Sequence, residues 1–269
     1  MSTPLTYGIT PDPVGRGAWR LTGGLLRVKP TSTSTAGYYR LAAAGEAPVG
    51  STWLTGKDRS DAARSVCLGV MAGQRLYGMT GADVDGWHGP ATDKMQRAAQ
   101  TRLGIDADGI GGRVTFRALL APLYSQVAAE SGVPLWALGG ISAKESSLDP
   151  AAVGTKTPYD HGLFQINLSP TAHGSNVAIE QAMDPWFAAR WTAGDLRRVY
   201  DRWNGLTKAD PYEVAVLHHN SPRNASLLAR TGEYPTEQAR RYVHGGTYTD
   251  STGRTVTEIG VRQAWEASA

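Results

Sequence analysis

One carboxylate is a candidate for chemistry because of the residues that surround it. The stretch ISAKESSLDP places Glu145 at the end of an expected helix, shortly before an Asp-Pro stop. The helix dipole disfavours a carboxylate at a C-terminus, and the apolar residues upstream of Glu145 disfavour its charged form further. A carboxyl group that keeps its proton near neutral pH can serve as a general acid. Glu145 is therefore the candidate catalytic residue.

A glycine and a strand-like apolar run follow in the stretch HGLFQINLSP, which carries Gln165 and Asn167. The pattern predicts a small β-ribbon with polar groups on it. General acid–base chemistry can use a second carboxylate beside the first. Asp160, just before the ribbon, is the best candidate for a second carboxylate, whereas Asp149 fits turn chemistry before Pro150.

Other chemistries lack the residues that they need. His218 and His219 are adjacent, so on a helix they diverge by about 100°, and no third-ligand pattern accompanies them. The serines of SAKESS have no Gly-x-Ser-x-Gly elbow for a nucleophile. A single cysteine, Cys67, excludes an internal disulfide and is expected to be a reduced, buried side chain. We expect neither a metal nor a cofactor.

Composition favours a soluble protein with an anionic partner. Of 269 residues, 41% are hydrophobic and 19% charged, and no apolar run approaches the roughly 18 residues of a membrane span. The net charge of +3 is mild and fits a cell-wall polymer, while no cluster of Lys and Arg with aromatics indicates nucleic-acid binding. The N-terminus lacks the apolar stretch of about 7 to 15 residues of a secretory signal, so no signal peptide is expected.

Several helices must position these residues. Residues 1–58 are rich in Gly, Pro, Ser and Thr and are compatible with short strands or an extended arm. Helical spacing begins near a cap at Ser60 or Asp61, and two helices are expected after Pro122, separated around Ser131–Pro134. Further helices are predicted over 185–204 and 210–220. The aromatic residues of the 185–204 helix are expected to pack into the core.

An internal near-repeat precedes these helices. DGWHGPATDKMQRA, from Asp85, is echoed by DGIGGRVTFRALLA, from Asp108, and each copy joins an Asp-Gly turn to a helix with a threonine near its start. Two such units after a helix resemble the peptidoglycan-binding domain found beside many cell-wall enzymes. Ala99 and Gln100 stand where that family has Phe-Gln. The resemblance covers about 61–121 and implies a small three-helix module.

Four motifs follow in order: ESSLDPAAV from Glu145, DHGLFQIN from Asp160, AVLHHNS from Ala215, and RRYV ending at Val243. Together they resemble the motifs of the lytic transglycosylase and goose-type lysozyme superfamily. The resemblance covers about 122–246. It implies a mainly helical, lysozyme-like catalytic domain of the α+β type, with a small β-ribbon opposite the catalytic acid.

The resemblance also implies roles for particular residues. Glu145 would be both catalytic acid and base. The substrate-binding residues would be Gln165 along the sugar groove, Asn220 beside the acid and Tyr242 near or over the site, together with Ser146, Asn167 and His219. His219 stands where the family usually has tyrosine, and Gln238 and Phe164 replace its glutamate and methionine. These departures leave the contacts of the replaced side chains open.

The expected architecture is a segment of unknown role (1–58), a peptidoglycan-binding-like domain (59–121) and a catalytic domain (122–269). It resembles a phage endolysin that acts on bacterial peptidoglycan as a monomer, without membrane insertion or nucleic acid. Such a protein is made in the host cytoplasm and reaches the wall after holin-type release. The expected reaction cleaves the MurNAc–GlcNAc β-1,4 bond and leaves 1,6-anhydro ends. Alternatives are a hydrolytic muramidase assisted by Asp160, and a virion-associated or non-catalytic wall-binding structural protein.

Overall fold

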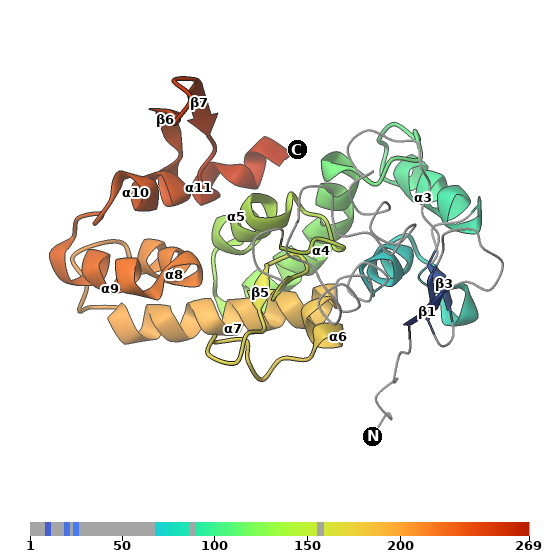
Figure 1. Ribbon diagram of the computed structural model, residues 1–269, viewed down its shortest axis with the longest axis horizontal. Coiled ribbons are helices and arrows are strands. Elements are labelled where there is room, and N and C mark those ends of the chain that lie inside the picture. Colours follow the sequence, from blue (N-terminus) through green and yellow to red (C-terminus); the bar gives the residue numbers. More distant parts are fainter. Residues whose placement is uncertain are drawn as a thin grey trace. The chain divides into compact units, whose positions relative to one another are not determined.

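The computed structural model describes residues 9–11, 19–21, 24–26, 68–84, 86, 90–154 and 159–268, which form a mainly helical protein with small antiparallel sheets (Figure 1). This confirms the mainly α class predicted from the sequence. The predicted helix cap at Ser60 or Asp61 and the predicted burial of Cys67 lie outside the described residues.

Two compact units make up the chain. The first contains residues 1–119 and 149–188, and the second contains residues 120–148 and 189–269. Two of the three boundaries fall inside the two longest described helices, α4 (Arg113–Ser131) and α7 (Pro185–Trp203), and the third lies between Leu148 and Asp149.

Helix α4 runs through Pro122, where the sequence suggested a break. Proline lacks the N–H of the helical ladder and crowds the carbonyl one turn earlier, which disfavours this position. The apolar side chains around it compensate, because Leu120, Leu123, Tyr124 and Val127 are all buried on one face. Packing of an amphipathic face stabilises a helix more than local propensity does. The predicted helix from Thr115 and the first helix after Pro122 are therefore one.

The first unit begins with three short strands, β1 (Ile9–Pro11), β2 (Trp19–Leu21) and β3 (Gly24–Leu26), paired antiparallel in that order. Short strands were one of the two expectations for this segment. Residues 68–76 are helical, as the spacing from Asp61 predicted. They are followed by η1 (Gly81–Asp83), α3 (Pro90–Arg102) and the start of α4.

The two copies of the near-repeat share one hydrogen-bonding arrangement. In each, a fully buried glutamine of the preceding helix accepts from the glycine N–H of the Asp-Gly turn and donates to the threonine hydroxyl. Gln74 does so at 3.0 Å for both bonds, and Gln100 at 3.0 and 3.1 Å; their partners are Gly86 and Thr92, and Gly109 and Thr115. Both glycines have positive φ, as predicted. The repeat is thus longer than its sequence motif, since it includes the glutamine before the turn.

The remainder of the first unit holds the predicted β-ribbon. Strands β4 (Asp160–His161) and β5 (Ile166–Asn167) pair antiparallel, and α6 (Ile179–Ala182) follows. Leu163, Phe164 and Ile166 are buried. The burial of these apolar residues therefore anchors the ribbon.

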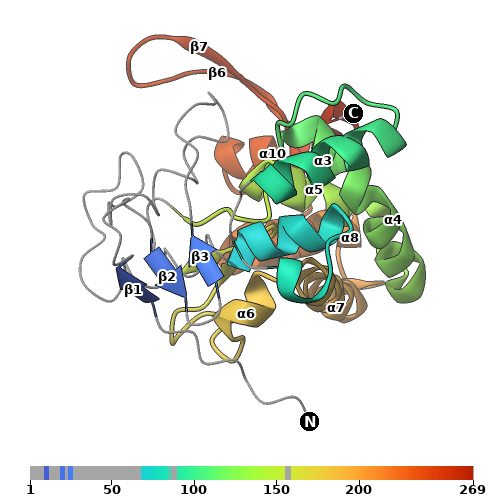
Figure 2. The ribbon, with the colours of Figure 1, turned by 90° about the vertical axis from the view of Figure 1, so that its right-hand side faces the viewer.

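The second unit is built from helices and one hairpin: the part of α4 from Leu120 onward, α5 (Leu135–Ser146), most of α7, α8 (Pro211–Asn220), α9 (Pro222–Thr231), α10 (Glu237–His244), β6 (Gly246–Thr249), β7 (Thr255–Glu258), α11 (Val261–Ala264) and η2 (Glu266–Ser268). The β6–β7 hairpin extends away from α10 and α11 (Figures 1 and 2). Helix α8 is the helix predicted over 210–220, and Asp210 caps it by accepting from the Tyr212 N–H.

Close packing of α5 against α11 fixes the centre of this unit. A Cβ atom at Gly139 would lie 2.6 Å from the ring of Trp265, and one at Gly140 would lie 2.1 Å from the carbonyl oxygen of Val261. Neither position can hold a larger residue without movement of its neighbour. The Gly-Gly pair therefore lets the two helices pack closely.

The aromatic residues of α7 are less buried than expected. Leu196 and Val199 are buried, but the aromatics are only half-buried, namely Trp186, Phe187, Trp191, Tyr200 and Trp203. The buried face is completed by small residues, Ala188, Ala189 and Ala193. The prediction that these aromatics are core residues was therefore wrong. Large rings extend to the edge of an apolar face, whereas alanines let the neighbouring helices approach its centre.

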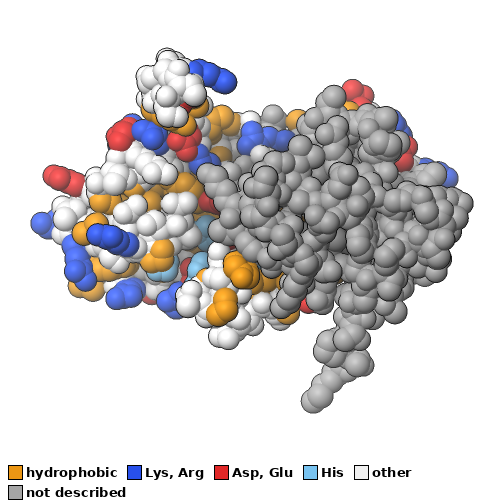
Figure 3. All heavy atoms as spheres, viewed as in Figure 1, with side chains coloured by type: hydrophobic (Ala, Val, Ile, Leu, Met, Phe, Trp, Pro, Cys, Tyr) orange, Lys and Arg blue, Asp and Glu red, His pale blue; other side chains and the backbone are white. Residues whose placement is uncertain are grey.

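On the face drawn in Figure 3, the basic side chains of the described residues lie apart from one another, among hydrophobic, acidic and neutral groups.

Crossing a membrane requires a helix that is both long and apolar. Over the described part of the chain, no helix combines the two.

Candidate active site

Glu145 lies in the last turn of α5, as predicted, and its side chain is half-buried. The helix ends because Ser147 adopts a left-handed conformation with φ of 57° and Leu148 follows at 66°. The Asp149 carboxylate then accepts from the Ala151 N–H at 2.8 Å, which is the turn role expected for it. The local sequence thus holds Glu145 at the very end of a buried helix.

Tyr242 of α10 contacts Glu145 directly. Its hydroxyl donates to Glu145 Oε1 at 2.5 Å, across 97 residues of sequence, and the tyrosine is only 6% exposed. Burial raises the pKa of Tyr242 well above its usual value, and the charge and hydrogen bond of Glu145 raise it further. The phenol therefore stays protonated and donates throughout the physiological pH range.

Helix α10 holds the tyrosine in place through its ends and its apolar face. The Thr236 hydroxyl accepts from the Ala239 N–H at 3.0 Å and caps the first turn. Ala239, Tyr242 and Val243 are the buried residues of the helix, which packs against α8 and α11. Tyr242 and Val243 lie three and four residues after Ala239, so the three side chains share one face of the helix and Tyr242 points inward.

The other predicted residues of the second unit occupy different settings. Ser146 is buried, and its hydroxyl donates to the Ser142 carbonyl at 2.8 Å within α5. The Ser146 hydroxyl therefore donates its proton to the backbone of its own helix. His219 is half-buried near the end of α8, and Asn220 is exposed as the last residue of that helix.

The ribbon of the first unit arranges three predicted residues. Asp160 and Asn167 are paired across β4 and β5, and the Asn167 amide donates to Asp160 Oδ1 at 2.8 Å. Gln165 has a φ of 48°, and its amide donates to the carbonyls of Gly162 at 2.9 Å and Ala152 at 3.3 Å. Positive φ in a non-glycine residue costs about 1 to 3 kcal/mol and persists only where other contacts impose it.

The structure therefore brings Glu145 together with Tyr242 in the second unit, and Asp160 together with Asn167 in the first. Among the described residues, no group of three or more His, Cys, Asp and Glu side chains is arranged to hold a metal ion.

Three residues next to the candidate pair were not anticipated from the sequence. The Glu258 carboxylate at the end of β7 contacts Lys144 of α5 and Arg241 of α10. Lys144 directly precedes Glu145, and Arg241 directly precedes Tyr242. Their position beside predicted site residues is the sequence signal by which they could have been found. Glu258 carried none, because 114 residues separate it from Lys144.

Comparisons with known proteins add no family assignment. No protein-family model matches the chain, and no curated protein matches it.

Proposed function

We propose that this protein is a peptidoglycan-cleaving enzyme with Glu145 as its catalytic acid and base. The observation that carries the proposal is the hydrogen bond of Tyr242 to Glu145 Oε1 at 2.5 Å. It joins the first and the last of the four sequence motifs that resemble lytic transglycosylases. Motifs that are distant in sequence but in contact through their polar groups are typical of a functional site.

The bond suits a carboxyl group that must deliver and then recover a proton. It engages Oε1, so Oε2 can carry the proton to the glycosidic oxygen between MurNAc and GlcNAc. The resulting carboxylate then takes a proton from the C6 hydroxyl of the muramoyl residue, and that oxygen bonds to C1 while the leaving sugar departs. The product is a 1,6-anhydro end. The donated hydrogen bond of Tyr242 stabilises the carboxylate between the two steps.

A single acid is enough for this reaction, which is why we favour a transglycosylase over a muramidase. Asp160 is the second carboxylate that a hydrolytic mechanism would use. Its Oδ1 accepts from Asn167 across the ribbon, a bond that suits a structural role. The module at 59–121 would bind the wall, and the biological setting would be host cell lysis by a phage endolysin.

The test is a zymogram on purified cell walls with the parent protein and Glu145→Gln. The amide is isosteric, still accepts from Tyr242 and carries no transferable acid proton, so we expect clearing to be lost while the thermal unfolding midpoint is retained. Glu130→Gln, at an exposed position in the same unit, is the matched control and should clear walls normally. Equal clearing by Glu145→Gln would leave a non-catalytic wall-binding protein as the better description.

Mass spectrometry of the released muropeptides separates the two enzymatic mechanisms. Ring closure adds no water, so anhydro products should be about 18 Da lighter than hydrolysed ones. Reducing ends alone would instead establish hydrolysis and restore a role for Asp160, for which Asp160→Asn would then be the next variant.

A further inference from the structure

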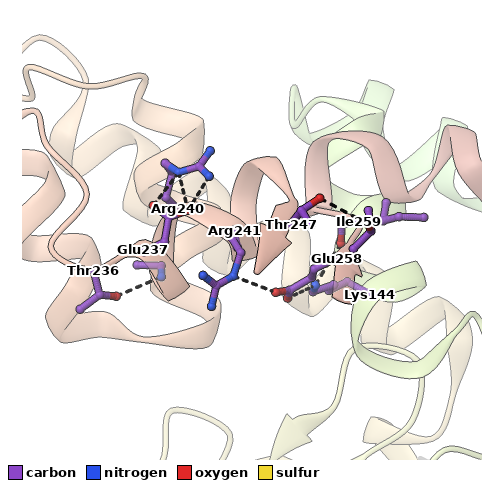
Figure 4. A network of polar contacts seen from close by, with 10 residues as sticks. Lys144, Thr236, Glu237, Arg240, Arg241, Thr247, Glu258 and Ile259 are labelled. Atoms are coloured by element: carbon purple, nitrogen blue, oxygen red, sulfur yellow. Dashed lines mark hydrogen bonds and ion pairs between the residues drawn. The ribbon is translucent and has the colours of Figure 1, made fainter. Parts of the chain in front are cut away.

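A single carboxylate bridges the two helices that carry the candidate catalytic pair. Glu258 is the last residue of β7, at the base of the projecting hairpin. Its Oε1 accepts from Lys144 Nζ of α5 at 2.5 Å, and its Oε2 lies 3.4 Å from Arg241 Nε of α10 (Figure 4). One side chain of the hairpin thus joins α5 to α10.

The bridge lies immediately beside the Glu145–Tyr242 hydrogen bond. Lys144 directly precedes Glu145, and Arg241 directly precedes Tyr242. The two helices are therefore joined twice at neighbouring residues, once directly and once through Glu258. Since adjacent residues share a rigid helical backbone, a restraint on one also fixes the position of the next.

Further contacts hold the bridge in place. Lys144 also donates to the Ile259 carbonyl at 3.0 Å, and its Nζ lies 5.9 Å from the centroid of the Tyr242 ring. The Arg241 guanidinium stacks 4.2 Å from the ring centroid of Tyr248 on β6. The lysine is thus in contact with both the bridging carboxylate and the tyrosine of the candidate site.

The burial of these charges makes the bridge sensitive to loss of its carboxylate. The side chains of Lys144, Glu258 and Arg241 are 18%, 28% and 15% exposed. Removing one partner of a partly buried ion pair leaves an uncompensated charge, which is far more disruptive than loss of a surface pair. Without Glu258, Lys144 and Arg241 would lack the carboxylate that neutralises them. Glu145 follows Lys144 directly in the sequence and is a candidate to replace that carboxylate. Pairing with either cation would compete with its bond to Tyr242.

We propose that Glu258 is a positioning residue, which holds Lys144 and Arg241 so that Glu145 and Tyr242 stay hydrogen-bonded to each other. It contacts no reacting atom and acts through its two cationic partners. The activity readout of this inference rests on the proposed function, but its structural readout does not.

The structural test uses the full chain labelled with 3-fluorotyrosine and followed by fluorine NMR. The signal of Tyr242 is assigned as the one lost in Tyr242→Phe, and it should move in Glu145→Gln. Glu258→Gln replaces one carboxylate oxygen with an NH2 group that cannot accept from a cation, so the Tyr242 signal should move there also. The matched control is Glu237→Gln, which removes the exposed partner of Arg240 on the same helix, and should leave the signal in place.

The functional test is a double-mutant cycle on the rate of cell-wall lysis. Glu258→Gln should lower the rate about tenfold in the parent protein, the size expected for coupled neighbouring residues. In a Tyr242→Phe background the same change should cost less than about twofold, because the bond that it protects is already absent. A purely structural role would give the same loss in both backgrounds.

The outcomes separate this inference from the proposed function. A Tyr242 signal and a lysis rate in Glu258→Gln that match those of Glu237→Gln would overturn the positioning role, as would an equal loss of rate in both backgrounds. A parent protein that does not cleave walls would remove the proposed function alone. The fluorine signal would then still decide whether Glu258 positions the Glu145–Tyr242 pair.

Discussion

Replacement of Gly140 by alanine should destabilise the protein, because α5 and α11 leave no room for a side chain. A Cβ at this position would lie 2.1 Å from the Val261 carbonyl oxygen and 3.0 Å from its Cγ1. The helices must separate by about 1 Å to relieve the first contact, and such overpacking costs typically 1 to 3 kcal/mol. A backbone carbonyl cannot turn aside as a flexible side chain can.

The gain in helix propensity offsets only part of this cost. Alanine favours a helix over glycine by about 1 kcal/mol. Since the contact involves main-chain atoms, the overpacking term belongs at or above the upper end of its range. We therefore expect Gly140→Ala to lower the free energy of unfolding by about 2 kcal/mol.

Gly194 is the matched control. It is an exposed glycine within α7, and a Cβ there would meet no atom within 4 Å. Gly194→Ala should therefore raise the free energy of unfolding by about 0.5 to 1 kcal/mol. The same chemical change should thus have opposite signs at the two positions.

Equilibrium urea unfolding of the three proteins, followed by tryptophan fluorescence, measures this contrast. The parent midpoint should lie between those of the two variants. Because α5 ends with the candidate acid, wall lysis should also be slower in Gly140→Ala. If Gly140→Ala were as stable as the parent, or as stable as Gly194→Ala, the close packing of α5 on α11 would be refuted.

Three further predictions concern the near-repeat, the core and the site. Gln100→Leu removes the side-chain partner of the buried Thr115 hydroxyl and of three part-buried groups at Asp108, Gly109 and Ile110, so it should lower the free energy of unfolding by about 1 to 3 kcal/mol in urea titrations. Leucine at exposed Gln126 should have little effect, and equal stabilities of the two variants would contradict this prediction. Burial raises the pKa of Tyr124 in the folded state, so the stability that it contributes is present below its unfolded pKa of 10.0 and is lost as the pH rises above that value. Tyr124→Phe should weaken the fall in unfolding midpoint above pH 10, and an unchanged slope would argue against this burial. Tyr242→Phe should slow wall lysis about tenfold or more, because a charge-assisted bond to Glu145 contributes about 1.5 to 3 kcal/mol, and a parental rate would remove the tyrosine from the site.

Local rules account for what the sequence predicted correctly. The helical class follows from apolar spacing, the end of α5 from its Asp-Pro stop, and the ribbon from a glycine followed by a strand-like run. The positive φ of both Asp-Gly turns follows from glycine itself. Each of these depends on residues within a few positions of one another, so a single sequence is sufficient to identify them.

Helix packing decided the rest. Tyr242 reaches Glu145 across 97 residues, and Glu258 reaches Lys144 across 114, so no local pattern could pair them. Packing also explains why α4 continues past Pro122. It likewise explains why the aromatic side chains of α7 are only half-buried. The sequence determined which residues could do chemistry and the local elements that carry them. Only the tertiary structure decided which of them touch, because contact at long range depends on how whole helices fit together.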